Sequence, residues 1–206
     1  MLRHGLACLL ALLLAAPSLA HGTCDDDSTH GYLVYAVGTI KIGMHCSFLY
    51  RPMPADDARA VSEGVIKPTL GGAFHLRVKN PDFSGDETGH VVVRRMPAGR
   101  YEVHDFAFGG LTPGVGSTAW SPARTFSLPF EIRSGEATYI GSFMRAPSLG
   151  TPLEARLGAA GFFVIADRAS RDLPIAAPRL PTGIRVANEV TDVDSLGSAA
   201  LRSRHP

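Results

Sequence analysis

The sequence predicts a mostly β protein, an antiparallel β-sandwich of about seven or eight strands with one or two short helices. Short runs of β-branched and aromatic residues recur along the chain, and glycine and proline separate these runs. Little of the chain shows the apolar spacing of an amphipathic helix. Two antiparallel sheets packed face to face accommodate such strands without crossover helices. A small closed β-barrel is the alternative architecture.

The N-terminal residues 1–20 have the three parts of an export signal. Arg3 begins a short positive start, residues 6–16 are an apolar core, and small residues precede a cleavage site after Ala20. A helix needs about 20 apolar residues to span a bilayer, and no later run approaches that length. We therefore expect no transmembrane span in the mature chain and an exported location, periplasmic or extracellular.

Cleavage after Ala20 leaves 186 of the 206 residues, enough for one sizeable core. We expect a single β-sandwich domain over residues 21–180 and a loosely structured C-terminal tail over 181–206, where periodicity is lost. The signal carries Arg3 and no acidic residue, so its removal takes the formal charge from +1 to zero. This balance gives no indication of a nucleic-acid partner.

The cysteines support an oxidising location. Cys8 leaves with the signal, and Cys24 and Cys46 remain as an even pair. A disulfide between them would close a loop of about 23 residues and contribute on the order of 3 kcal/mol. Two alternatives stay open: both thiols are free, or Cys24 is the lipidated N-terminus of an outer-membrane lipoprotein, which would exclude the disulfide.

Individual elements follow from local patterns. Apolar or alternating runs predict strands at 32–38, 47–50, 73–78 and 161–166. Short helices are expected at 56–61 and within 167–175, where later glycine or proline residues end them.

Two hairpins are predicted from turn residues. Pro97 and Gly99 would fold residues 91–96 back onto 100–103. In the second, Phe126 to Ile132 alternate, Ser134 and Gly135 turn, and residues 137–143 return. Pro129 cannot donate to a β-ladder, which places its strand at an edge or a bulge.

The segment MPAGRYEV resembles the corresponding hairpin of carboxypeptidase-regulatory-like and prealbumin-like β-sandwich domains. FSLPFEIRSGEATYIGSF resembles the matching segment of uncharacterised exported bacterial proteins with such a fold. Together the resemblance covers residues 91–143, and a glycine-rich insertion between the two segments departs from the compact pattern. It implies a β-sandwich in the cell envelope with an accessory, adhesive or structural role, and it implies no catalytic residue.

His104 and Asp105 are the candidate catalytic residues. Val103 places the core face on odd positions and Phe106 places it on even ones, so a β-bulge at His104 and Asp105 would reconcile the two. A histidine beside a carboxylate can accept a proton or bind a metal. The alternative is two polar side chains at a strand kink that face water.

Other signals for chemistry are weak. The histidines are scattered, and the sequence lacks metal-binding, nucleophile-elbow and phosphate-loop motifs, so we predict no metal and no cofactor. Residues 109–123 read as a long glycine-rich loop that carries Trp120, the sole tryptophan. Long loops with an aromatic residue often bind partners, so Trp120 is a candidate binding residue.

The sequence as a whole favours an exported envelope protein that acts as a non-enzymatic binding or accessory β-sandwich. Its partner would be an unknown envelope protein or a small ligand. One alternative is a hydrolase or metal-dependent enzyme of unrecognised type that uses His104 and Asp105. The other is a structural subunit of a surface assembly, joined through an exposed strand edge.

Overall fold

The computed structural model describes residues 29–40, 45–53, 64–66, 80–112, 116–120, 126–147, 161–196 and 201–204. The strands are β1 (His30–Thr39), β2 (His45–Pro52), β3 (Gly64–Ile66), β4 (Thr88–Pro97), β5 (Gly99–Thr112), β6 (Gly116–Trp120), β7 (Leu128–Ile132), β8 (Glu136–Pro147), β9 (Gly161–Ala166), β10 (Arg185–Asn188) and β11 (Leu201–Arg204). The helices are α2 (Ala169–Ala176) and two short 3₁₀ turns, η2 (Ala177–Arg179) and η3 (Val193–Leu196).

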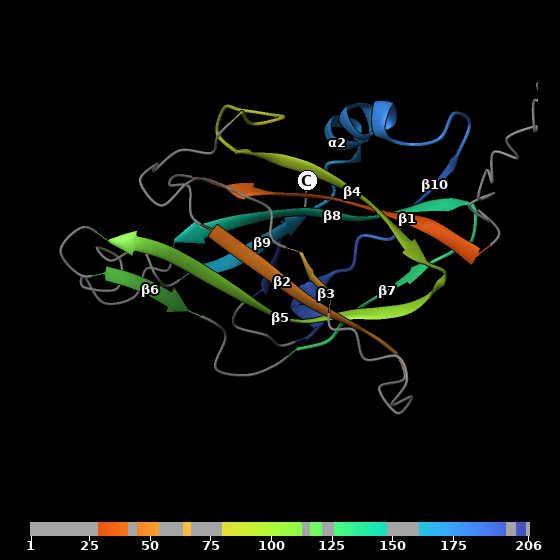
Figure 1. The fold of residues 1–206 in the computed structure, drawn as a ribbon. Coiled ribbons are helices and arrows are strands. Elements are labelled where there is room, and N and C mark those ends of the chain that lie inside the picture. Colours follow the sequence, from red (N-terminus) through yellow and green to blue (C-terminus); the bar gives the residue numbers. More distant parts are fainter. Residues whose placement is uncertain are drawn as a thin grey trace, which may run out of the picture.

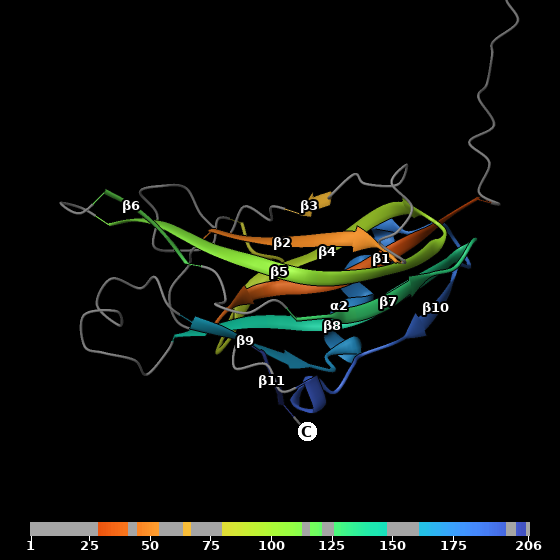
Figure 2. The same ribbon diagram turned by 90° about the horizontal axis from the view of Figure 1, so that it is seen from below.

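These strands form two stacked sheets, so the predicted mostly β, sandwich-like fold is confirmed (Figure 1). Sheet A runs β11-β9-β8-β1-β4 with β10 beside β8, and sheet B runs β3-β2-β5-β6 with β7 beside β5. The two sheets are separate within the described part of the chain, rather than closed into the alternative barrel. Helix α2 covers the outer face of sheet A, and the turned view shows sheet B as a second layer (Figure 2).

Sheet A is mixed rather than antiparallel throughout. β1 pairs with β8 in parallel, and β10 and β11 lie parallel to β8 and β9. Side-chain alternation has the same period in parallel and antiparallel strands, so the sequence pattern does not distinguish them.

Both predicted hairpins are wrong in their pairing. β4 pairs with β1 in sheet A, whereas β5 pairs with β2, β6 and β7 in sheet B. Likewise β7 belongs to sheet B and β8 to sheet A. Each turn therefore carries the chain from one sheet to the other, as an arch. The Tyr101 hydroxyl donates to the Pro97 carbonyl oxygen at 2.9 Å and closes the first arch, and Gly135, at φ 68°, turns the second.

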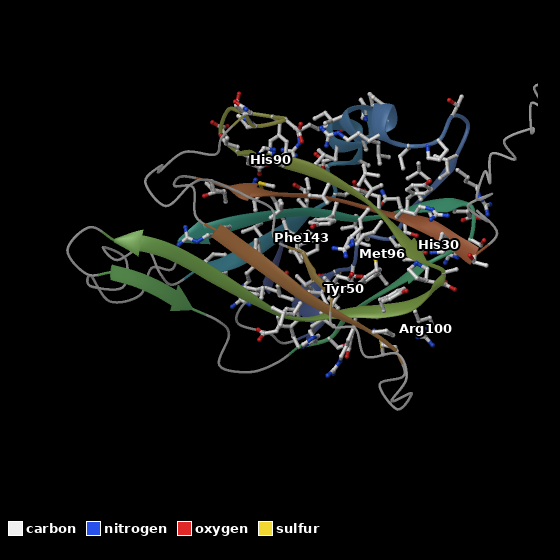
Figure 3. The ribbon with its side chains drawn as sticks, viewed as in Figure 1. His30, Tyr50, His90, Met96, Arg100 and Phe143 are labelled. Atoms are coloured by element: carbon white, nitrogen blue, oxygen red, sulfur yellow. The ribbon has the colours of Figure 1, made fainter. Side chains whose placement is uncertain are left out.

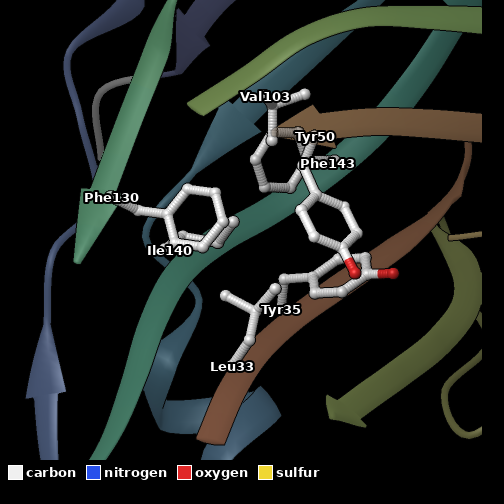
Figure 4. A pocket seen from close by; sticks show the side chains of 7 residues that line it. All are labelled: Leu33, Tyr35, Tyr50, Val103, Phe130, Ile140 and Phe143. Atoms are coloured by element: carbon white, nitrogen blue, oxygen red, sulfur yellow. The ribbon is translucent and has the colours of Figure 1, made fainter. Parts of the chain in front are cut away.

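The space between the sheets is filled with aromatic and aliphatic side chains. Phe106 of β5 meets Phe163 of β9 edge-on, with ring centroids 4.8 Å apart, and Phe163 in turn packs edge-on against Phe143. A small cavity of about 10 Å³ remains between the sheets (Figure 4). It is no larger than one water molecule and its lining is almost entirely apolar, so it is a packing defect of the core rather than a ligand site.

Two β-bulges reset which side chains face the core. In β5, Asp105 pairs with Leu49 and Val103 with Tyr50, so His104 is the extra residue and the predicted bulge is confirmed. In β8, the register with β1 shifts beside Ile140, where Gly141 has φ 111°. Each bulge puts two residues three positions apart on the same face of the sheet.

Several expected segments take a different form. Residues 181–206, expected as a loose tail, include β10, η3 and β11, and the two strands are hydrogen-bonded into sheet A. The expected loop at 109–123 is partly a hairpin, because the end of β5 pairs with β6. Glycines and small residues hide the alternation there, and backbone hydrogen bonds hold the pair together. The helix expected within 167–175 is α2, with Pro174 inside it.

Other expectations lie outside the described residues. These are the signal at 1–20, the helix at 56–61 and the strand at 73–78. Among the described helices, none is both long enough and apolar enough to cross a membrane.

Candidate functional site: an arginine-lined groove

The bulge in β5 turns His104 and Asp105 toward different partners. The Asp105 carboxylate accepts the backbone N–H of Phe106 at 2.8 Å, which stabilises the bulge itself. His104 is buried. It is one of the groups that lower the pKa of the Glu102 carboxyl, two residues earlier on the strand. The catalytic role expected of His104 and Asp105 stays a prediction. Neither of them lines the core cavity of Figure 4 or the groove described below.

Glu102 is the centre of a polar cluster that the sequence did not reveal. Its carboxylate accepts the Arg51 Nε–H at 2.6 Å and the Ser127 hydroxyl at 2.5 Å, one on each oxygen. Burial raises the pKa of the Glu102 carboxyl, but these hydrogen bonds and the charges of Arg51 and His104 outweigh burial, so the pKa lies below its usual value. A carboxylate with both oxygens occupied and a lowered pKa is a poor general base and a poorer general acid.

A second polar network fastens α2 to sheet A. The buried Asp172 carboxylate accepts the Tyr139 hydroxyl at 2.6 Å and the Arg171 Nε–H at 2.7 Å. Arg171 also donates to Glu87 and to Ser142, both at 2.8 Å, and stacks over a phenylalanine ring. Because these groups satisfy one another, we interpret the network as structural. The β8 bulge makes it possible, since Tyr139 and Ser142 would otherwise lie on opposite faces.

A groove of about 470 Å³ lies at the end of the sandwich where β4 arches into β5. We call it the arginine groove. Its volume lies in the range of about 300–1,000 Å³ that is typical of ligand sites. Among the described residues, three arginines and no acidic residue line it, together with two tyrosines and the turn between the strands. These lining residues are Tyr50, Pro52, Met53, Arg94, Arg95, Met96, Pro97, Ala98, Gly99, Arg100 and Tyr101.

Two of these arginines are available to a ligand. The Arg94 guanidinium lies over the Tyr50 ring, 5.4 Å from its centroid, so an aromatic face of sheet B positions a cation of sheet A. Arg100 is exposed at the start of β5 (Figure 3). Among the described residues, neither guanidinium makes a hydrogen bond or an ion pair, in contrast to Arg51, Arg171 and Arg179.

Groups of this kind recognise anions. A guanidinium presents a planar fork of N–H donors that matches a carboxylate or a phosphate, and stacking on an aromatic ring orients that fork. Burial, and to a smaller extent the neighbouring Tyr50, raise the pKa of the Tyr101 hydroxyl. The hydroxyl therefore stays protonated and keeps its hydrogen bond to the Pro97 carbonyl oxygen of the turn. The arginine groove is thus a positive, preorganised opening on a rigid scaffold.

The remaining sequence candidates are not placed at this groove. Cys24 and the side chains of Cys46 and Trp120 lie outside what the structure describes, so their proposed roles stay predictions. Among the described residues, no three His, Cys, Asp or Glu side chains gather as metal ligands. Sequence reasoning missed Arg94 and Arg100, because the only available signal was three arginines around a predicted turn.

Comparison with known proteins adds little. No protein-family model matches the chain, and no curated protein matches it. A leucine-rich repeat protein from Bacteroides thetaiotaomicron matches in structure with a TM-score of 0.31 and 10% sequence identity. That match covers 57% of this chain and 14% of the other, so it carries no argument about function.

Proposed function

We propose that the protein is an exported, non-enzymatic β-sandwich that binds an anionic component of the cell envelope through the arginine groove. The observation that carries this proposal is the pair of guanidiniums of Arg94 and Arg100, which have no hydrogen-bond or ion-pair partner among the described residues and lie at an opening without a described acidic side chain. The signal at residues 1–20 supports export. The resemblance to carboxypeptidase-regulatory-like domains agrees with an accessory binding role.

Electrostatics give the expected behaviour of such a site. Each hydrogen bond between charged groups contributes about 1.5–3 kcal/mol, so loss of one corresponds to roughly a ten- to hundredfold loss of affinity. Binding of an anionic partner also weakens as salt screens the charges, over a Debye length of about 8 Å at physiological ionic strength.

Affinity capture from the native envelope fraction tests the proposal. The mature chain, immobilised, is compared with the double variant R94Q/R100Q and with R185Q, a control whose side chain is 77% exposed at a different place on sheet A. We expect the captured component to be lost with R94Q/R100Q, retained with R185Q and eluted by salt. Equal capture by all three proteins would show that the arginine groove is not the binding site.

A further inference from the structure

We propose that the arginine groove takes an amphiphilic anion, a single molecule with a carboxylate or phosphate head group and an apolar tail. This inference rests on the proposed function, because it takes the groove to be the binding site. It adds the class of ligand: the head group pairs with Arg94 and Arg100, and the tail packs on the apolar part of the lining.

The first argument is that the polar side chains of the groove are nearly all cations. Besides the arginines, the described lining has two tyrosine hydroxyls as its other polar side-chain groups. The Tyr101 hydroxyl is already used in its hydrogen bond to the Pro97 carbonyl oxygen at 2.9 Å. No serine, threonine, asparagine, glutamine or histidine is among these lining residues. A sugar or another polyol would therefore find few neutral partners, and hydroxyl groups without partners are costly to bury.

The second argument is that the backbone around the turn adds little to this set of donors. Two of the lining residues are prolines, which have no N–H group. The N–H of Met53 donates to the Arg100 carbonyl oxygen, and the N–H of Ala98 donates to the Thr29 carbonyl oxygen, both at 2.8 Å. These amides connect neighbouring strands and are not available to a ligand. Donation to a head group therefore falls mainly to the guanidiniums.

The third argument is that apolar surface adjoins the cations. Pro52 and Met53 are half-buried at the end of β2, and Pro97 and Ala98 are exposed in the turn between β4 and β5. A methionine side chain is flexible and adapts to irregular apolar partners. An alkyl or aromatic tail would cover this surface, whereas a free phosphate would leave it exposed to water.

The cationic and apolar parts belong to one opening. The Arg94 guanidinium lies over the Tyr50 ring, 5.4 Å from its centroid. The ring covers one face of the guanidinium, and the N–H groups at its edge remain for a head group. Tyr50, Met96 and Arg100 lie at the same end of the sandwich (Figure 3). The volume of about 470 Å³ suits one small amphiphile.

The test uses the mature chain with fatty acids as defined probes. Isothermal titration calorimetry at low salt measures the binding of octanoate and dodecanoate, each below its micelle concentration. Acetate has the head group without the tail, and dodecyltrimethylammonium has the tail with the opposite charge. Burial of one methylene group changes affinity about fourfold. We therefore expect dodecanoate to bind about tenfold more tightly than octanoate or better, and the two control ligands to show no measurable binding.

Variants separate the head-group contact from the tail contact. R100Q removes one charged hydrogen bond and should weaken octanoate and dodecanoate by the same factor, about tenfold or more. M53Q keeps the length of the side chain but makes it polar, so it should weaken dodecanoate more than octanoate. R94Q/R100Q should abolish the binding of both. R185Q, changed at an exposed arginine elsewhere, should bind as wild type. Circular dichroism of each variant checks that it is folded.

Several results would overturn the inference. Equal affinity for octanoate and dodecanoate would show that the tail makes no contact, and equal binding of dodecyltrimethylammonium would show that the charge makes none. Binding that survives R94Q/R100Q would place the ligand elsewhere. A wild type that binds neither fatty acid but sediments with phosphatidylglycerol vesicles through the two arginines would assign the groove to a membrane surface.

The two proposals can fail separately. If neither fatty acid binds but envelope capture still depends on Arg94 and Arg100, the groove takes another anion and only this inference is lost. If dodecanoate binds as expected and capture shows no dependence on the arginines, the amphiphile site stands and the proposed envelope partner is lost.

Discussion

Replacing Tyr139 by phenylalanine should destabilise the protein more than replacing Tyr101 does, although both changes remove one hydroxyl group. The Tyr139 hydroxyl donates at 2.6 Å to the carboxylate of Asp172, and both residues are 0% exposed. The Tyr101 hydroxyl donates at 2.9 Å to a neutral backbone carbonyl, and Tyr101 is 8% exposed. The Tyr139 hydroxyl also accepts the backbone N–H of Arg168 at 3.3 Å, so Y139F removes a second, longer hydrogen bond in addition to the one to the buried charge.

The magnitudes follow from those two environments. A hydrogen bond to a charged group contributes about 1.5–3 kcal/mol, and one between neutral groups about 0.5–1.5 kcal/mol. Y139F also leaves one Asp172 oxygen without its donor in a place that water does not reach. We therefore expect Y139F to cost about 2 kcal/mol of unfolding free energy and Y101F about 1 kcal/mol. For a chain of this size these values correspond to Tm losses of about 4–8 °C and 2–4 °C.

Urea unfolding of the mature chain at pH 7, followed by circular dichroism, measures both free energies. The single variant D172N and the double variant Y139F/D172N complete a double-mutant cycle, in which a direct interaction appears as a departure from additivity. A Y139F loss no greater than that of Y101F would refute the reasoning. So would strict additivity of the two changes in the cycle, because the hydroxyl and the carboxylate would then not be coupled.

Three further predictions rest on other contacts. The pKa of Glu102 is lowered in the folded state, so its contribution to the free energy of unfolding is complete above the unfolded value of 4.5 and is lost as the pH falls through the folded value. R51Q removes one cause of the lowered pKa and should therefore make the urea midpoint less sensitive to acid below pH 4.5. G31A should destabilise the protein by several kcal/mol or prevent folding, because the added Cβ would lie 2.1 Å from a backbone oxygen. Thermal unfolding, or the yield of soluble protein, measures this effect. Intact mass of the exported protein, before and after reduction, should show Cys24 and Cys46 linked, and an added lipid mass would exclude that bond.

Alternation and turn residues predicted the fold class and several strands. Residues 161–166 read as a doubly apolar strand and form β9, and the change of parity between Val103 and Phe106 predicted the bulge at His104. The corresponding bulge at Gly141 was not predicted, because the residues around it are apolar on both faces and show no change of parity. A bulge is readable from a sequence only where polar and apolar residues alternate on both sides of it.

Pairing partners were not predictable in the same way. The turn at Pro97–Gly99 reverses the chain in both a hairpin and an arch, and the strands on either side keep the same alternation in both. The difference lies in where the backbone hydrogen bonds go, and long-range partners such as β1 and β2 decide that. The bulge also directs one Asp105 carboxylate oxygen to the backbone N–H of Phe106, a local contact that the sequence pattern did not predict.

The corrected topology also explains why the candidate site was hidden. In a hairpin, Arg94 and Arg100 would belong to adjacent strands of one sheet and their side chains would stand on its faces. In the arch, β4 is the edge strand of sheet A and β5 lies in sheet B, so the turn spans the open side between the sheets. Arg94 can then reach across to the Tyr50 ring of sheet B, and Arg100 follows on the other side of the turn. The same change that overturns the predicted hairpin therefore creates the arginine groove, and Thr29 is hydrogen-bonded to that same turn.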